Sequence, residues 1–421
     1  MLAVVLVFIG TTAVRSQSLE PLVLERTGVF CVDDPYCFNR LHPDIPAIAQ
    51  AEPGQTIVMG TRDALDGPFG PGATPEDVVA ADLSLVHPMT GPVYIEGAER
   101  GDVVAVTVED IEPDPYGYTV IAPGFGFLRD LFPDPYIANW SLDRTAAVSA
   151  EIPQVKIPFA PFTGSIGVLP GEPELEEFLS REAELAEVGG IALAPLPTGA
   201  LPADLCGPEG IDKDRCLRTI PPRENGGNMD VKQMQVGTTI LLPCFVDGCG
   251  LFIGDVHYAQ GDGEVSGTAI EMGATVTVST DVRKGLGDLV KAPQFEGGEQ
   301  LKAIAPAAFY GTTGIPIKKA GEIPPYHTYL DSETLEPLRN LSEDLTLAAR
   351  NALIDMVDYL VEEHGLSPEQ AYVVASVAVD LRIGQLVDVP NYLVSAILPL
   401  TIFDDSETSQ GATAVATVSA Q

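Results

Sequence analysis

Basic residues are scarce in this chain of 421 residues, which has 23 Lys and Arg against 60 Asp and Glu and a formal net charge of −37. Lysine occupies only eight positions. A negative excess of this size repels nucleic-acid phosphates and anionic lipid headgroups at every approach. The composition therefore predicts that neither nucleic acid nor a membrane is a partner of the mature protein.

Long hydrophobic runs are also missing. The one apolar run, residues 2–9, is far too short to cross a bilayer as a helix, which needs about 20 residues. Small residues follow it, so residues 1–17 fit a secretory signal peptide, although no basic residue precedes Leu2. A buried N-terminal strand is the alternative. A signal peptide predicts a periplasmic or secreted protein, and the cytoplasm is the alternative compartment.

Cysteine is limited to six residues, in three local sets: Cys31/Cys37, Cys206/Cys216 and Cys244/Cys249. An even number in close pairs is typical of an oxidising compartment. None of the sets has the CxxC spacing of a structural zinc site. We expect disulfides at the first two pairs and leave the third open, with six reduced and buried thiols as the alternative.

Glycine and proline are abundant, at 41 and 36 residues, while 45% of the chain is hydrophobic and the mean hydropathy is +0.17. Such a chain buries a core, and its many turns favour short strands over a helix bundle. We predict six parts along the chain: the signal peptide at 1–17, a β-rich part at 18–170, a helix and proline-rich insertion at 171–224, a glycine-rich β part at 225–300, a C-terminal α/β part at 301–405 and a flexible tail at 406–421.

Several elements can be predicted from local patterns. Apolar periodicity and capping residues predict helices over 172–187, 345–361 and 368–380. β-Branched runs predict strands over 55–59, 101–108, 238–245 and 267–280. Asp247-Gly248 is a typical hairpin turn, so residues 249–253 are expected to return antiparallel to the strand before it.

The run 254–264, GDVHYAQGDGE, concentrates the groups that carry chemistry. In an alternating strand Asp255 and His257 share one face, where a carboxylate and an imidazole can reach one cation. Glycines at 261 and 263 allow the backbone to approach a ligand closely. Asp230 follows another glycine pair, and Glu271 lies in the strand expected to pair nearby.

Each of these residues also has a structural interpretation. Asp230 and Asp262 could be ordinary turn acids, Glu264 and Glu271 solvated strand carboxylates, His257 a core histidine and Lys232 a surface cation. His42 and His87 each precede a proline and could cap backbone groups. There is no GxSxG elbow, phosphate-binding loop or dinucleotide fingerprint, so serine-hydrolase, kinase and dehydrogenase chemistry have no support.

Longer segments resemble the acetamidase/formamidase family, in its longer, formamidase-type form. The resemblance runs from about residue 25 to residue 405. It is carried by NRLHPDIP (39–46), TRDALDG (61–67), HPMTGPVYIEGAERGD (87–102), GFGFLRDLFPDPYIANW (124–140), PPRENGGNMDVK (221–232), GDVHYAQGDGE (254–264), TAIEM (268–272), SPEQAY (367–372), VDVPNYLVS (387–395) and LPLTIFD (398–404).

The resemblance implies an α+β fold that is predominantly β, with a β-sandwich or barrel-like core and a smaller α/β part carrying the late helices. It also implies a homo-oligomer that hydrolyses short linear amides, such as formamide or acetamide, to a carboxylate and ammonia. Two departures put the preferred amide in question. Leu41 replaces an aromatic residue, and residues 264–268 lack a cysteine that long members often have.

Our leading hypothesis is a hydrolase in which a divalent metal, zinc in the first place and calcium as the alternative, activates water. Its candidate residues are Asp230, Asp255 and His257 as metal ligands, Glu264, Glu271 and Lys232 as catalytic groups, and Asn228, Gln260, His87 and His42 around the substrate. The alternatives are a non-catalytic periplasmic β protein that binds a cation or small amide, and a lactam or other amide hydrolase of the same family.

Overall fold

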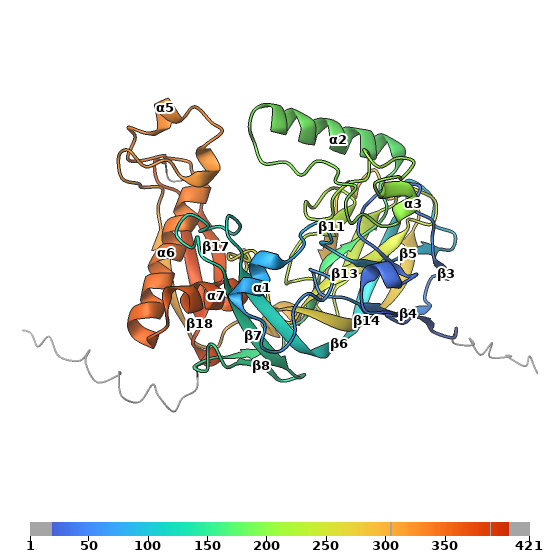
Figure 1. The fold of residues 1–421 in the computed structure, drawn as a ribbon, viewed down its shortest axis with the longest axis horizontal. Helices are drawn as coiled ribbons and strands as arrows, with labels where there is room; N and C mark the ends of the chain where they lie inside the picture. The colour runs from blue at the N-terminus through green and yellow to red at the C-terminus, as the bar shows by residue number, and fades with distance from the viewer. Residues whose placement is uncertain (1–18, 304, 388, 404–421) are drawn as a thin grey trace, which may run out of the picture.

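The computed structural model describes residues 19–303, 305–387 and 389–403. The predicted signal peptide at 1–17 and the predicted tail at 406–421 lie outside these residues. Figure 1 shows a large β-rich part beside a C-terminal layer of helices and strands, drawn in orange to red. The fold is α+β and predominantly β, as the sequence predicted. In the part of the chain that is described, no helix has both the length and the apolar content needed to span a membrane.

The large part is built on one branched sheet, in which 15 strands of the described chain take part. Its central path runs β11-β10-β13-β14-β6-β7-β8-β9, and the pairs β1/β4 and β3/β5 are parallel while the rest are antiparallel. The strands are β1 Leu22–Leu24, β2 Cys37–Phe38, β3 Ala49–Ala51, β4 Thr56–Thr61, β5 Met89–Ile95, β6 Val103–Ile121, β7 Tyr136–Leu142, β8 Ala146–Ser149, β9 Lys156–Pro158, β10 Phe162–Gly167, β11 Gly226–Asn228, β12 Thr239–Pro243, β13 Leu251–His257, β14 Glu271–Arg283 and β15 Gln294–Glu296.

The strands predicted at 55–59, 101–108, 238–245 and 267–280 correspond to β4, β6, β12 and β14. β14 is the long central member, because it pairs with β6 along nearly its whole length and with β4 on its other side. Its alternating residues Ala274, Val276 and Val278 are buried, so they anchor the core of the sheet.

The hairpin predicted at Asp247-Gly248 is wrong. β12 pairs with β6 and β15, whereas β13 pairs with β5, β10 and β14. Every residue of β13 is buried, so this strand lies in the middle of the sheet. A strand in that position needs partners along both of its edges, and a hairpin with β12 would provide only one. A turn dipeptide specifies the local reversal of the chain and does not specify the partner strand.

The C-terminal layer contains a second sheet of β16 Phe309–Gly314, β17 Asp380–Gln385 and β18 Leu393–Pro399, with β18 in the middle. Helix α6, Leu345–His364, packs on β16 and β18, and α7, Pro368–Ala378, packs against α6 and reaches β6. Asp344 caps α6 and Ser367 forms a capping box with Gln370 at α7, which confirms the two predicted helix starts.

The predicted surface helix is α2, Glu172–Glu187, which lies along the top of the molecule in Figure 1. Only Leu175 and Phe178 of this helix are buried. The remaining helices are short: α1 Pro75–Ala80, α3 Ala203–Cys206, α4 Gln300–Ala303, α5 Ser332–Leu335, and the 3-10 turns η1 Cys31–Asp33, η2 Pro325–His327 and η3 Leu400–Ile402. The boundaries of the six predicted parts stay a prediction.

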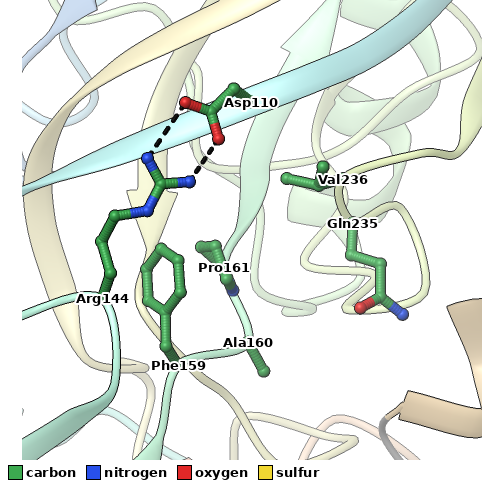
Figure 2. Close-up of a pocket in the computed structure, with 7 residues that line it drawn as sticks. All are labelled: Asp110, Arg144, Phe159, Ala160, Pro161, Gln235 and Val236. Carbon is green, nitrogen blue, oxygen red and sulfur yellow. Dashed lines mark hydrogen bonds and ion pairs between the residues drawn. The ribbon is translucent and has the colours of Figure 1, made fainter.

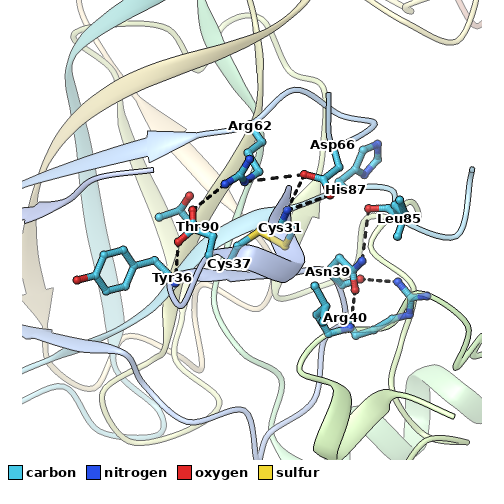
Figure 3. Close-up of a disulfide and its surroundings, with 12 residues drawn as sticks. Cys31, Tyr36, Cys37, Asn39, Arg40, Arg62, Asp66, Leu85, His87 and Thr90 are labelled. Atoms are coloured by element: carbon cyan, nitrogen blue, oxygen red, sulfur yellow. Dashed lines mark hydrogen bonds and ion pairs between the residues drawn. A yellow bond between two sulfur atoms is a disulfide. The ribbon is translucent and has the colours of Figure 1, made fainter. Parts of the chain in front are cut away.

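Three disulfides join cysteines within the described residues: Cys31–Cys37, Cys206–Cys216 and Cys244–Cys249. They include the two predicted pairs and the pair that the sequence left open. Figure 3 shows the first bond beside the buried Asp66, whose two carboxylate oxygens accept hydrogen bonds from the Cys31 amide at 2.9 and 3.0 Å. Cys37 pairs with Thr90 of β5, so this bond ties the N-terminal loop to the sheet.

Candidate active site

A buried imidazole and two buried carboxylates form the deepest part of the site. His257 ends β13 and pairs directly with Glu271, the first residue of β14. The Nε2 atom of His257 lies 3.3 Å from Oδ1 of Asp255 and 3.3 Å from Oε2 of Glu271. The side chains of all three residues are 1–2% exposed. We call Asp255, His257 and Glu271 the deep triad.

Two further carboxylates lie on the more open side of the same imidazole. Asp230 approaches Nε2 of His257 at 4.0 Å and Glu264 at 3.9 Å. Their side chains are 19% and 18% exposed, in contrast to the deep triad. We call Asp230 and Glu264 the rim pair, because they are the more exposed members of the cluster.

The candidate ligand atoms therefore divide into two groups that share His257. One group is the deep triad and the other is His257 with the rim pair, and within each group the ligand atoms lie within 4.8 Å of one another. The sequence hypothesis joined Asp230, Asp255 and His257 as one ligand set. The structure brings all five predicted residues together and groups Asp255 with Glu271.

Gln260 and β10 determine how the imidazole is oriented. The Nδ1 atom of His257 is 2.9 Å from Oε1 of Gln260, whose amide nitrogen donates to the carbonyl of Asp230 at 2.8 Å. Because an amide oxygen only accepts, Nδ1 carries the proton and Nε2 faces the carboxylates. The ring of Phe162 meets the imidazole edge-on at 5.1 Å, and Gly164 leaves space beneath it.

Three of the carboxylates sit on left-handed backbone. The φ angles are 52° at Asp230, 49° at Asp255 and 42° at Glu264. In the described residues only six non-glycine positions have positive φ, so half of them belong to this cluster. Such a conformation costs about 1–3 kcal/mol for a residue with a Cβ and is typical of functional sites. Asp255 adopts it inside β13, whose pairing with β10 keeps the same register on both sides of this residue.

The charged groups of the cluster shift one another's pKa values. Burial raises the pKa of Glu271 and of Glu264 to about 8 in each case, and neighbouring carboxylates add to the rise. Burial and the charge of Glu264 also hold the pKa of Asp230 well above its ordinary value. These three groups therefore favour their protonated forms near neutral pH.

For the imidazole, neighbouring charges outweigh burial in setting the pKa. Burial lowers the pKa of His257, but the charges of Glu271 and Asp255 outweigh it and leave the pKa well above the usual value. Burial raises the pKa of Asp255, and the imidazoles of His87 and His257 more than compensate, so it ends below the ordinary value. These shifts favour the charged form of the imidazole and the ionised form of Asp255.

The donor set fits a divalent cation. Oε2 of Glu271 and Oδ1 of Asp230 are buried and have no hydrogen-bond partner among the described residues. A buried acceptor without a partner costs free energy, which a positively charged ligand removes. One imidazole nitrogen with carboxylate oxygens is a ligand set typical of zinc, whereas calcium prefers oxygen alone.

The other predicted residues divide between the site and its surroundings. Ser165 connects Asn228 to the deep triad. Its hydroxyl is 3.1 Å from Oδ1 of Asn228 and 3.3 Å from Oδ2 of Asp255. His87 is 3.9 Å from the same Asp255 oxygen, and burial lowers the pKa of His87. Figure 3 shows this histidine on the chain that leads into β5.

Lys232 and His42 have partners outside the cluster. Lys232 forms a buried ion pair with Asp380, the first residue of β17. His42 is fully buried, and its Nε2 lies 2.9 Å from Asp212. Sequence reasoning missed Ser165, Gly164 and Asp380, because each lies in an ordinary strand sequence and only the tertiary pairing brings it near the site.

A surface cavity of about 240 Å³ is lined in part by residues 159–161, the segment that leads into β10. Figure 2 shows Phe159 and Pro161 against the ion pair of Arg144 with Asp110, with Gln235 and Val236 opposite. None of the residues that line this cavity belongs to the deep triad or the rim pair. It is therefore a separate feature of the surface.

Fold and cluster together define a predominantly β protein with a buried imidazole–carboxylate centre suited to a divalent cation and to proton transfer. Comparison with known proteins gives the family. Residues 26–405 match the Acetamidase/Formamidase family, and the chain belongs to it.

Similar proteins cover most of the chain. It is 35% identical to a protein named acetamidase from Mycolicibacterium smegmatis over 80% of this chain and 84% of that protein. It is 30% identical to a protein named formamidase from Methylophilus methylotrophus, over 87% and 89%. The solved structure of a gamma lactamase from Delftia acidovorans matches with a TM-score of 0.81 and 31% identity, covering 91% of this chain and 94% of that one.

Proposed function

We propose that this protein hydrolyses short linear amides to a carboxylate and ammonia. Membership of the family and the names of the similar acetamidase and formamidase support amide hydrolysis. The single observation that carries the proposal is the geometry around His257, where two buried carboxylate oxygens, Oδ1 of Asp255 and Oε2 of Glu271, each lie 3.3 Å from Nε2. A centre of this kind is suited to an ion or a reacting group that occupies the space between them.

The deep triad would hold a divalent cation, with zinc expected from its mixed nitrogen and oxygen ligands. Such an ion polarises a carbonyl and lowers the pKa of bound water. Gln260 keeps Nε2 of His257 facing the ligand position, because its Oε1 accepts a hydrogen bond from the Nδ1–H group. The hydroxyl of Ser165 donates to Oδ2 of Asp255, the carboxylate oxygen that does not face His257, and this hydrogen bond stabilises the ionised form of Asp255.

The rim pair would carry the proton transfers. The charge of Glu264 raises the pKa of Asp230, and a hydrogen bond from Asp230 lowers the pKa of Glu264, so Asp230 holds its proton more tightly than Glu264 does. One carboxylate of such a pair can accept a proton from water while the protonated one donates to the leaving nitrogen. This assignment makes Glu264 the general acid–base candidate and Glu271 a ligand.

The test is ammonia release from formamide and acetamide by the purified protein, before and after treatment with a chelator and after addition of zinc. We expect turnover that chelation removes and zinc restores, with bulky aryl amides as poor substrates. Binding of the amide without ammonia release would instead favour a non-catalytic binding protein. Release that survives complete removal of metal would contradict the role of the deep triad.

A lactam is the second candidate substrate, because the chain aligns with the gamma lactamase structure over 91% of its length. Hydrolysis of a lactam gives an amino acid and no ammonia, so the two activities are separated by the product. A panel with a five-membered lactam beside formamide decides between them.

We also infer an exported homo-oligomer. The three local disulfides support an oxidising compartment. Exposed apolar side chains on and after the edge strand β17, namely Ile383, Val387 and Val389 at 58%, 77% and 58% exposure, support a subunit interface there. Cell fractionation and light scattering of the native protein test these two points.

A further inference from the structure

The rim pair stands on two loops and not on regular elements. Asp230 comes two residues after β11, and Glu264 lies between β13 and β14. Both have left-handed backbone, with φ of 52° and 42°. Since a residue with a Cβ does not favour this conformation by itself, contacts from outside each loop must maintain it.

Asp380 contacts both loops with a single carboxylate oxygen. Its Oδ1 accepts from the ammonium of Lys232, two residues beyond Asp230, and from the amide of Asp262 at 3.2 Å, two residues before Glu264. Asp380 is only 2% exposed. A buried charge–charge contact of this kind is specific in geometry, because neither charge can be left without its partner at low cost.

Additional bonds join the same two loops near Asp380. Oδ1 of Asp262 accepts from the side-chain amide of Gln233 at 2.9 Å, and its carbonyl accepts from the amide of Leu381 at 3.1 Å. The two loops are therefore connected to each other and to the start of β17.

Helix α7, which ends just before Asp380, holds the far side of the Glu264 loop. The Ser376 hydroxyl accepts from the amide of Ser266 at 3.0 Å and donates to the carbonyl of Thr268 at 2.7 Å. The Tyr372 hydroxyl donates to the carbonyl of Val265. The loop is thus fixed on both sides of the glutamate.

We propose that Asp380 is a positioning residue that holds Asp230 and Glu264 at the opening of the site, through Lys232 and the Asp262 amide. As far as turnover is concerned, this inference rests on the proposed amide hydrolysis. It assigns to Lys232 a positioning role in place of a direct part in the chemistry.

The experiment compares three variants with the wild-type protein: Asp380→Asn, Lys232→Met, and the double variant Lys232→Met/Asp380→Leu. The single variants leave one buried group without its partner and are expected to lower the melting temperature. The double variant replaces the ion pair by two packed apolar side chains, which often restores stability. It cannot restore the acceptor for the Asp262 amide, so it separates stability from positioning.

For the double variant we expect a melting temperature close to wild type, unchanged zinc content, and kcat lower by about 10–100-fold with a smaller change in KM, as for residues that orient a reacting group. Hydrogen exchange of the Asp262 amide and of peptides over 229–235 and 260–268 should be faster. Arg382→Ala is the control, because Arg382 also binds Asp380, at 3.1 Å, but is exposed and contacts neither loop in the described structure.

Wild-type turnover per folded molecule in the double variant would overturn the proposal, as would unchanged exchange in both loops. Loss of turnover in Arg382→Ala to the same degree would overturn it as well. A wild-type protein without turnover on any amide would contradict the proposed function instead, and the exchange measurement would still decide whether Asp380 holds the two loops.

Discussion

Gly164 lies directly beneath the imidazole of His257. A Cβ atom at this position would lie 2.7 Å from Cε1 and 2.8 Å from Nε2 of the ring, and 2.7 Å from the carbonyl oxygen of Asp255. Contacts this short cannot be accommodated, and the carbonyl cannot move without displacing β13, which is buried along its whole length. The absence of a side chain at this position of β10 thus leaves the room that the imidazole occupies.

Gly164→Ala should therefore displace His257 and reduce both zinc content and turnover, the latter by about 100-fold or more, since a displacement of about 1 Å at a reacting centre has effects of this size. Metal analysis and ammonia release on folded protein measure the effect. Gly70→Ala is the matched control, because a Cβ there has nothing within 4 Å. Normal zinc content in Gly164→Ala would show that the ring is free to move.

His257→Ala should remove the metal and abolish turnover, because His257 is the one residue shared by both groups of ligand atoms. Asp255→Asn should behave in the same way. His364→Ala serves as the control: this ring stacks on Phe403 at 3.7 Å, outside the cluster, and its loss should leave zinc content unchanged. If His257 were only a packing residue, the alanine variant would melt at a lower temperature and keep its turnover.

Glu264→Gly should be more stable than Glu264→Ala in the metal-free state, by about 1 kcal/mol, because glycine alone relieves the left-handed backbone at φ 42°. Both variants lose the buried carboxyl group, so their difference isolates the backbone. Both should retain zinc and lose most turnover if Glu264 is the acid–base group. Chemical denaturation gives the stability difference, and equal stabilities would show that no strain is stored there.

Metal binding should release protons and become tighter as the pH rises from about 6 to about 9. The sign follows from the raised pKa of Glu271, about 8. Below that value this carboxyl group holds a proton in the metal-free protein, and His257, whose pKa is also raised, must lose its proton before Nε2 can act as a ligand. Calorimetry of zinc binding in buffers of different ionisation enthalpy counts these protons, and an affinity independent of pH would contradict the assignment.

Removing the first disulfide should destabilise the N-terminal edge. Cys31 and Cys37 are separated by six positions, and closing a loop of this length contributes about 2 kcal/mol in the chain-entropy description. Cys31→Ser/Cys37→Ser should lower the free energy of unfolding by roughly that amount. Peptide mapping without reductant should link Cys31 to Cys37 and Cys206 to Cys216, and six alkylatable thiols in the unreduced, unfolded protein would contradict the inferred export.

Elements with local signals could be predicted from the sequence. Helix α2 was predicted with the bounds it has, and the starts of α6 and α7 were predicted from capping residues, of which Asp344 and Ser367 are the caps in the structure. The pairing of β12 and β13 was predicted wrongly, because a strand that is buried on both faces chooses its partners through tertiary packing.

The residues of the site also divide into those that the local sequence indicates and those that only the tertiary structure brings there. Asp230, Asp255, His257, Glu264 and Glu271 could be found because they are crowded into two glycine-rich segments and one neighbouring strand. Gly164 and Asp380 could not be found, since the importance of each depends on the segment that folds against it. The partner of Lys232 lies 148 positions further along the chain, and no local pattern indicates it.

The contact of Asp380 with the two rim loops has a consequence for the order in which the protein matures. Both loops leave the ribosome well before the residues of α7 and β17 that hold them. A chain that ends before residue 380 contains β13, β14 and the deep triad but lacks the carboxylate that contacts both loops. In a protein with the proposed metal centre, the opening of the site would therefore reach its final geometry only after the C-terminal layer has docked, and a chain cut before residue 380 would keep the deep triad without a fixed opening.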